Sequence, residues 1–341
     1  MSKPVIYVLS LGGTIAMTKD PDSAGGVVPS LTGEALVASV PDLGRVAQIK
    51  TEQIAQLGSS ELQFDDLDAV AERIRQLHQD NACHGVVITQ GTDTIEESAF
   101  ILDCLLDVPF PVVVTGAMRN PTLPGSDGPA NILSSVRVAT DPAAHHCGVL
   151  VVLNDEIHAA RFVHKAHTTL PNAFVSINGG RIGWLSENNV FILFRPEPMP
   201  TIKSVNTPKQ VVVPLIKAGL GDSGVLLSLI EQHVGQFQGL VIEGTGGGHV
   251  SEQFAQRIEQ LTKKIPVVMA SRTGQGSTLT QTYGYPGSEI DLLNKGVIMA
   301  GWMDGTKARI ILNLLLRHQK HEYSQIVRVF QAWGGHAKAD G

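Results

Sequence analysis

The sequence predicts an α/β protein of two α/β domains: a larger N-terminal domain with a mostly parallel sheet, and a smaller, Rossmann-like C-terminal domain. Short apolar runs alternate with stretches of helical spacing, a pattern typical of strands and helices around a parallel sheet. The 341 residues, 43% of them hydrophobic, are enough for two cores. The regular pattern stops near Ser186, and a proline-rich stretch follows. We therefore expect a first domain over residues 1–190, a linker over 191–210 and a second domain over 211–341.

The first apolar run, residues 5–16, predicts a buried parallel strand that ends at Gly12 and Gly13. Paired glycines let the backbone turn sharply, so the hydroxyl of Thr14 would lie uncovered at the edge of the sheet. That position suits a nucleophile. Turn chemistry alone is equally compatible with a threonine that only caps the next segment.

Residues 17–33 are rich in Gly, Asp, Ser and Pro and lack apolar periodicity. They predict a long irregular loop, which could be a mobile lid beside Thr14. A surface loop without a role in the mechanism is the alternative.

The remaining elements of both domains follow from apolar spacing. In the first domain we expect strands at 46–57, 85–89, 111–115 and 148–153, and helices at 62–79, 96–106 and 126–139. In the second we expect strands at 211–216, 240–243 and 267–270, and helices at 224–234, 252–263 and 305–316.

Polar side chains follow four of the predicted strands. In open parallel sheets, ligands bind beyond the carboxyl ends of the strands, and the starts of the following helices add backbone N–H donors. The sequence therefore predicts a site for a small molecule at this edge. The groups placed there are Thr14, Ser59 with Ser60, Thr92 with Asp93, and Asn154 with Asp155.

A hydroxyl nucleophile needs a base. Lys165 could supply it if an apolar wall keeps its amine neutral part of the time. A solvated surface lysine fits the same pattern.

Two other motifs suggest different kinds of site. The glycine-rich residues 244–248 resemble a phosphate-binding loop, but they lack the Lys-Ser/Thr of a P-loop and the dinucleotide spacing. His158, His164 and His167 lie near Asp155 and Glu156, but no two of these histidines have the spacing of a helical ligand pair. Histidines that form hydrogen bonds or lie exposed are favoured over a metal site, and we expect neither metal nor cofactor.

Net charge and cysteine content limit the kinds of partner and the cell compartment that we expect. The net charge is −6 and no basic run occurs, so we expect no nucleic-acid or membrane partner. Cys83, Cys104 and Cys147 are odd in number and form no CxxC pair, which favours free thiols in a reducing compartment. No secretory signal and no apolar run of about 18 residues is evident. We expect a cytoplasmic protein.

Several motifs, taken in order, resemble those of the bacterial-type L-asparaginase family, and the cytoplasmic type is favoured over the secreted type. The resemblance covers the chain from about Val5 to the C-terminal region. The motifs are Gly12-Gly13-Thr14-Ile15-Ala16, residues 88–94 (ITQGTDT), Gly116-Ala117-Met118-Arg119, Asp127-Gly128 with Asn131, Asn154-Asp155 with Lys165, Ala270-Ser271-Arg272 and Lys307-Ala308-Arg309.

The resemblance implies an amidohydrolase that converts L-asparagine to L-aspartate and ammonia without metal or cofactor. It implies that Thr14 is the nucleophile and that Thr92, Asp93 and Lys165 form a second catalytic group that relays protons. The same resemblance places Ser59 on the substrate α-carboxylate and Asp93 on its α-ammonium. It also implies a homodimer or homotetramer whose sites form at a subunit contact.

The chain departs from the family pattern at three places. No tyrosine occurs between Tyr7 and Tyr283, whereas the family's lid commonly carries one, and Val27 or a neighbour takes that region. Ser60 stands where the secreted members usually have glutamine. The partner-subunit asparagine is replaced within residues 246–248, and Glu289 is the best match to the acidic residue that reaches across the subunit contact.

Three other functions remain as alternatives. The first is the asparaginase-like subunit of an amidotransferase, which shares these motifs. The second is a non-catalytic amino-acid sensor on the same scaffold, suggested by the missing lid tyrosine. A cofactor-binding oxidoreductase is the least favoured, because the dinucleotide spacing fails.

Overall fold

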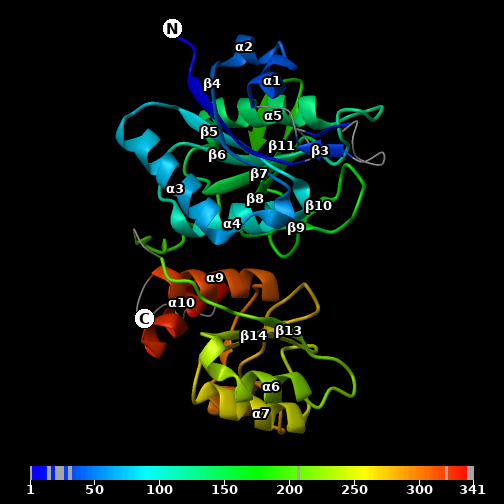
Figure 1. Cartoon of the computed structure of the whole chain (residues 1–341), viewed down its shortest axis with the longest axis vertical. Coiled ribbons are helices and arrows are strands. Elements are labelled where there is room, and N and C mark those ends of the chain that lie inside the picture. Colours follow the sequence, from blue (N-terminus) through cyan, green and yellow to red (C-terminus); the bar gives the residue numbers. More distant parts are fainter. Residues whose placement is uncertain are drawn as a thin grey trace. The chain divides into compact units, whose positions relative to one another are not determined.

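The computed structural model describes residues 2–13, 17–19, 27–29, 33–205, 208–318 and 322–335. The chain divides into two compact units, Met1–Pro198 and Met199–Gly341. Each unit has its own parallel or mostly parallel sheet with helices packed on it (Figure 1). The predicted fold class, two α/β domains of which the first carries the larger sheet, is confirmed.

The described part of unit 1 is built on an eight-stranded sheet in the order β12-β11-β8-β7-β6-β5-β1-β4. Strands β4, β1, β5, β6 and β7 run parallel, whereas β8, β11 and β12 extend the sheet in antiparallel fashion. The bounds are β1 (Val5–Gly12), β4 (Gln48–Leu57), β5 (Gly85–Thr89), β6 (Val112–Thr115), β7 (Val149–Leu153), β8 (Glu156–Ala159), β11 (Gly183–Ser186) and β12 (Asn189–Ile192).

Helices cover both faces of this sheet, which is why its central strands are continuous apolar runs. Every residue of β5, β6 and β7 is buried. Helices α1, α2 and α5 lie on one face, and α3 and α4 lie on the other (Figure 1). Their bounds are α1 (Gly33–Ala38), α2 (Leu43–Val46), α3 (Phe64–Gln79), α4 (Ile95–Leu105) and α5 (Gly128–Thr140).

Two 3₁₀ turns, η2 (Ser59–Glu61) and η3 (Thr92–Thr94), follow β4 and β5 at their carboxyl ends. A third, η4 (Pro142–Ala144), connects α5 to the start of β7. Strands β9 (Val163–Lys165) and β10 (Phe174–Ser176) form a separate antiparallel pair.

The prediction of an irregular loop over residues 17–33 is wrong in part. Strand β2 (Met17–Lys19) pairs in antiparallel fashion with β3 (Val27–Pro29), and α1 begins at Gly33. Strands of three residues are too short for an alternating apolar pattern to be recognised. The other residues of this predicted loop, 20–26 and 30–32, lie outside the described residues.

The described part of unit 2 has a four-stranded parallel sheet in the order β13-β14-β15-β16. Helices α6 and α7 lie on one face, and α9 and α10 lie on the other (Figure 1). The bounds are β13 (Leu215–Lys217), α6 (Val225–Gln232), η5 (Val234–Gln236), β14 (Leu240–Gly244), α7 (Glu252–Thr262), β15 (Val267–Ser271), α8 (Glu289–Asn294), β16 (Ile298–Met299), α9 (Gly305–His318) and α10 (Tyr323–Gly334).

The strand expected at 211–216 begins later, at Leu215. Pro214 has no N–H to donate to a ladder, and the N–H of Val212 donates to the Gln238 side chain, 2.8 Å away, rather than to a strand. In the described parts of both units, no helix combines the length and the apolar character that crossing a membrane requires.

Candidate active site

The loops that follow β1 and β5 contact each other at two glycines. Gly13 has a φ of +85°, and a Cβ built on it would lie 1.9 Å from the backbone nitrogen of Gly91. Only glycine fits such an approach at a positive φ. Thr14, the predicted nucleophile, lies outside the described residues, so its role stays a prediction. Gly13, which makes the contact with Gly91, is the residue directly before it.

Three predicted site residues come together at the end of β5. Lys165 Nζ lies 2.8 Å from Thr92 Oγ1 and 2.6 Å from Asp93 Oδ1. Thr92 and Asp93 belong to η3, between β5 and α4, whereas Lys165 is the last residue of β9. The Lys165 side chain is 11% exposed and that of Asp93 is 75% exposed. Thr92 is buried as well, so the threonine and the lysine are sheltered while the carboxylate faces solvent.

Ser59 lies against the same loop. A Cβ added to Gly91 would lie 2.8 Å from Ser59 Oγ, and Thr94 Oγ1 donates a hydrogen bond to the Ser59 carbonyl at 2.9 Å. Ser59 is buried and Ser60 is exposed. Of the two serines, Ser59 therefore contacts Gly91, the residue that precedes Thr92.

A cavity of about 240 Å³ opens beside this group, and the described residues that line it are Asp93, Lys165, Ala166, His167 and Thr168. Its volume is below the ~300–1,000 Å³ typical of sites for drug-sized ligands. It suits a small molecule that offers a cation to Asp93.

The loop after β6 is closed by Asp127. Its carboxylate accepts the N–H groups of Met118, at 3.0 Å, and Arg119, at 2.8 Å. Asn131 Nδ2 donates to the carbonyl of Gly116 at 2.9 Å. These motif residues fix a loop at the carboxyl edge of the sheet by hydrogen bonds to its backbone.

Asn154 and Asp155 serve a tight turn. Both have a positive φ, 52° and 57°, and they join the antiparallel strands β7 and β8, as the central residues of a type I′ hairpin do. The Asp155 carboxylate accepts a hydrogen bond from Ser134 Oγ at 2.8 Å. Both residues therefore have a role in the turn, and their predicted contribution to the ligand site stays a prediction.

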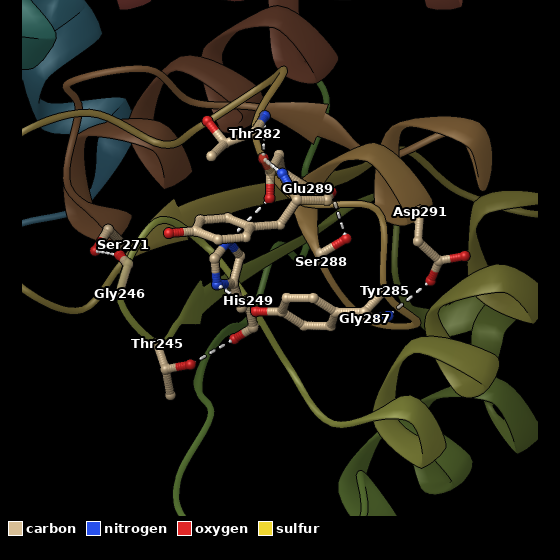
Figure 2. Close-up of polar contacts among 11 residues, drawn as sticks. Thr245, Gly246, His249, Ser271, Thr282, Tyr285, Gly287, Ser288, Glu289 and Asp291 are labelled. Atoms are coloured by element: carbon tan, nitrogen blue, oxygen red, sulfur yellow. Dashed lines mark hydrogen bonds and ion pairs between the residues drawn. The ribbon is translucent and has the colours of Figure 1, made fainter.

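Glu289 belongs to unit 2 and is fully buried there. Its Oε1 accepts the N–H groups of Thr282, at 2.7 Å, and Tyr283, at 2.6 Å, and its Oε2 lies 2.9 Å from His249 Nε2 (Figure 2). Burial opposes its ionisation, but these backbone N–H groups and His249 hold its pKa below the ordinary value. The hydroxyl of Tyr285 lies 3.0 Å from His249 Nδ1. Both carboxylate oxygens of Glu289 are therefore engaged within unit 2, and its predicted contact with a ligand stays a prediction.

The glycine-rich residues 244–248 form a turn that uses its own donors. The N–H of Thr245 donates to the carbonyl of His249 at 2.8 Å, and the N–H groups of Gly248 and His249 donate to the carbonyl of Thr245. Ser271 Oγ donates to the carbonyl of Gly246 at 2.6 Å (Figure 2). These contacts close the turn, and they engage the N–H groups of Thr245 and Gly248 together with that of the following residue, His249.

The three clustered histidines have separate partners. His158 Nδ1 lies 2.8 Å from Ser176 Oγ, His164 Nδ1 lies 2.7 Å from Glu96 Oε2, and His167 Nδ1 accepts the N–H groups of residues 169 and 170. Within the described ranges, no three His, Cys, Asp or Glu side chains are arranged to hold a metal ion.

Sequence reasoning missed one residue next to this group, Glu96. Its Oε2 accepts the backbone N–H of Lys165 at 2.9 Å. In the sequence, Glu96 is only an acidic residue in the first turn of a predicted helix, which is common because it suits the helix dipole. No local signal distinguishes it, since its partner lies 69 residues away.

Comparison with known proteins gives matches along most of the chain. The family model "Asparaginase, N-terminal" matches residues 5–198, and "Glutaminase/Asparaginase C-terminal domain" matches residues 212–330. A probable periplasmic L-asparaginase of Haemophilus influenzae is 33% identical over 321 residues, 93% of this chain and 90% of that protein. L-asparaginase 2 of Bacillus subtilis is 34% identical, covering 92% of this chain and 82% of that protein.

A solved structure is also similar. The crystal structure of a probable cytoplasmic L-asparaginase from Campylobacter jejuni has a TM-score of 0.84 and 30% sequence identity, and the match covers 97% of this chain and 100% of that one.

Proposed function

This chain belongs to the bacterial-type L-asparaginase family, and from that premise we propose that it hydrolyses L-asparagine to L-aspartate and ammonia. The observation that carries the proposal is the contact of Lys165 Nζ with both Thr92 Oγ1 and Asp93 Oδ1. A lysine held between a threonine hydroxyl and a carboxylate can pass protons at a small, partly enclosed site.

The reaction has two steps. In the first, the Thr14 hydroxyl oxygen bonds to the side-chain amide carbon, the carbon–nitrogen bond breaks, and ammonia leaves with the proton that Thr14 gives up. In the second, water attacks the resulting ester, and L-aspartate forms while the Thr14 hydroxyl takes back a proton. The pair of Thr92 and Lys165, 2.8 Å apart, relays the proton in each step.

Substrate binding uses the charges of the amino acid. Asp93 presents a mostly exposed carboxylate, which suits the α-ammonium group, while hydroxyl and N–H donors near Ser59 and Ser60 suit the α-carboxylate. Glu289 adds a second carboxylate if it reaches the site from a partner subunit. The protein works as a homodimer or homotetramer in this proposal.

We place the enzyme in the cytoplasm. The similar Campylobacter jejuni protein is called cytoplasmic, whereas the Haemophilus influenzae relative is called periplasmic. Cell fractionation checks the location, and light scattering after size exclusion checks the oligomer.

The test is ammonia release by the purified chain from a panel of amino-acid amides. We expect asparagine to be the best substrate. Thr14→Ala should abolish turnover, and Thr92→Val and Lys165→Met should each lower kcat by roughly 10²–10⁴-fold, the range for loss of a general acid or base. Thr140→Val is the matched control, because the hydroxyl of Thr140 donates to the Arg137 carbonyl at the end of α5, outside the site.

Two outcomes contradict the proposal. One is a folded wild-type chain that binds asparagine in calorimetry without releasing ammonia, as a sensor would. The other is a Thr14→Ala variant that keeps most of its activity. Asparagine hydrolysis that requires a co-purifying partner chain would instead indicate an amidotransferase subunit.

A further inference from the structure

We propose that Glu96 is a positioning residue for Lys165: it fixes the end of β9 against α4, so that the lysine amine reaches Thr92. This inference rests on the proposed function, because it gives Glu96 a task within that reaction.

A single carboxylate oxygen holds two successive residues of β9. Glu96 Oε2 accepts the backbone N–H of Lys165 at 2.9 Å and lies 2.7 Å from Nδ1 of His164. The Glu96 side chain is only 15% exposed. Hydrogen bonds to an ionised acceptor are stronger than those between neutral groups, so this contact defines where the backbone of Lys165 lies.

Strand β9 is short and lies outside the main sheet, although its first residue, Val163, is buried. It is three residues long, and in the described part of the chain it pairs with β10 alone, apart from the eight-stranded sheet. An isolated pair of strands is marginally stable by itself. The flexible lysine side chain can meet Thr92 at 2.8 Å only from a limited range of backbone positions.

Glu96 is well placed to set that position. It lies in the first turn of α4, and α4 follows directly from η3, which carries Thr92 and Asp93. The backbone of Lys165 is thus tied to the same rigid segment that carries its two side-chain partners. A displacement of about 1 Å at a catalytic group can cost on the order of 100-fold in rate.

The competing explanation is an ion pair between Glu96 and His164 that serves stability only. The His164 side chain is 41% exposed, so solvent screens this pair. The two explanations predict different variants to matter. His164→Ala removes the ion pair but leaves the acceptor for the Lys165 N–H, whereas Glu96→Ala removes both.

The experiment measures kcat and KM for asparagine, with melting temperature, in the full chain and its variants. We expect Glu96→Ala to lower kcat about 100-fold while KM changes little, because Asp93 and Ser59 remain. Glu96→Gln should recover most of kcat, since its amide oxygen still accepts the N–H. His164→Ala and the matched control Glu97→Ala, on the same turn of α4, should keep kcat near that of the wild type.

If Glu96→Ala fails to fold, Glu96→Asp replaces it. Aspartate keeps the charge but is one methylene shorter, so we expect a lower kcat than for Glu96→Gln. Two results overturn the role of Glu96 while the proposed function stands, because the wild type hydrolyses asparagine in both. In one, the Glu96 variants match the wild type in kcat. In the other, His164→Ala loses as much kcat as Glu96→Ala. A wild-type chain without amide hydrolysis overturns both the role of Glu96 and the proposed function.

Discussion

Acidification from pH 7 to pH 5 should destabilise unit 1 through His158. The residue is 2% exposed, and its ring lies between Ser176 Oγ, at 2.8 Å from Nδ1, and Glu156 Oε2, at 3.5 Å from Nε2. Burial lowers its pKa from the ordinary 6.5 to about 4, although the carboxylate of Glu156 opposes this effect. The folded protein therefore keeps the ring neutral where the unfolded chain protonates it.

The sign and size follow from proton linkage. Between the two pKa values the unfolded state binds more protons, so the free energy of unfolding falls as the pH falls. The contribution of His158 is fully present above about pH 6.5 and is lost as the pH falls toward 4. The loss is about 2 kcal/mol by pH 5 and about 3 kcal/mol when complete, because one pKa unit corresponds to about 1.4 kcal/mol.

The assay is urea unfolding followed by circular dichroism at a series of pH values. The wild type is compared with His158→Gln, whose amide can still form a hydrogen bond with Ser176 but does not titrate. Carboxylates with lowered pKa, such as Glu52 and Glu289, also weaken the fold in acid, but they do so in both proteins. The difference between the two curves isolates the histidine.

His146→Asn is the matched control. His146 is exposed in the same unit, and its φ of 58° is one that asparagine tolerates. We expect this variant to follow the wild-type curve. If wild type and His158→Gln lose the same stability between pH 7 and pH 5, or if the ring titrates near 6.5 in the folded protein by NMR, the reasoning is refuted.

Two further predictions concern the scaffold of the site. Gly13→Ala should lower the free energy of unfolding by at least about 2 kcal/mol and remove most of the activity, because the added Cβ would meet Gly91 at a positive φ. The control is Gly44→Ala, whose added Cβ meets nothing within 4 Å. It should change neither the stability in urea nor the release of ammonia. Arg161→Ala should cost about 3–5 kcal/mol in urea unfolding, because it leaves the buried carboxylate of Asp103 without the partner now 3.1 Å away. A loss below about 1 kcal/mol would contradict the second prediction.

The parallel part of the main sheet could be predicted because both its faces are covered. Strands such as β5 and β7 are then uninterrupted apolar runs, and the helices between them keep a clear apolar spacing. In α3 the buried positions include Leu67, Ile74 and Leu77, on one face. These signals are local, so they can be recognised without the tertiary structure.

The antiparallel extension and the short strands could not be predicted. Strands β9 and β10 have three residues each, and the apolar pattern over so few residues is uninformative. Lys165 meets Thr92 across 73 positions of sequence, and no spacing rule connects them. Its place after Asn154 and Asp155 made Lys165 a candidate base, but a solvated surface lysine fitted that pattern as well, and only the family resemblance favoured the first interpretation. Nothing in the sequence singled out Glu96.

Much of the cavity wall belongs to the connection between β9 and β10, and not to the core of the protein. Three of the described lining residues, Ala166, His167 and Thr168, come from this connection, whereas Asp93 comes from the main sheet's edge. Surface connections tolerate changes of sequence and length far better than buried strands do. For protein engineering, the exposed residues 166–170 are therefore the segment in which the cavity can be enlarged or narrowed for other amides while the folded core is left as it is.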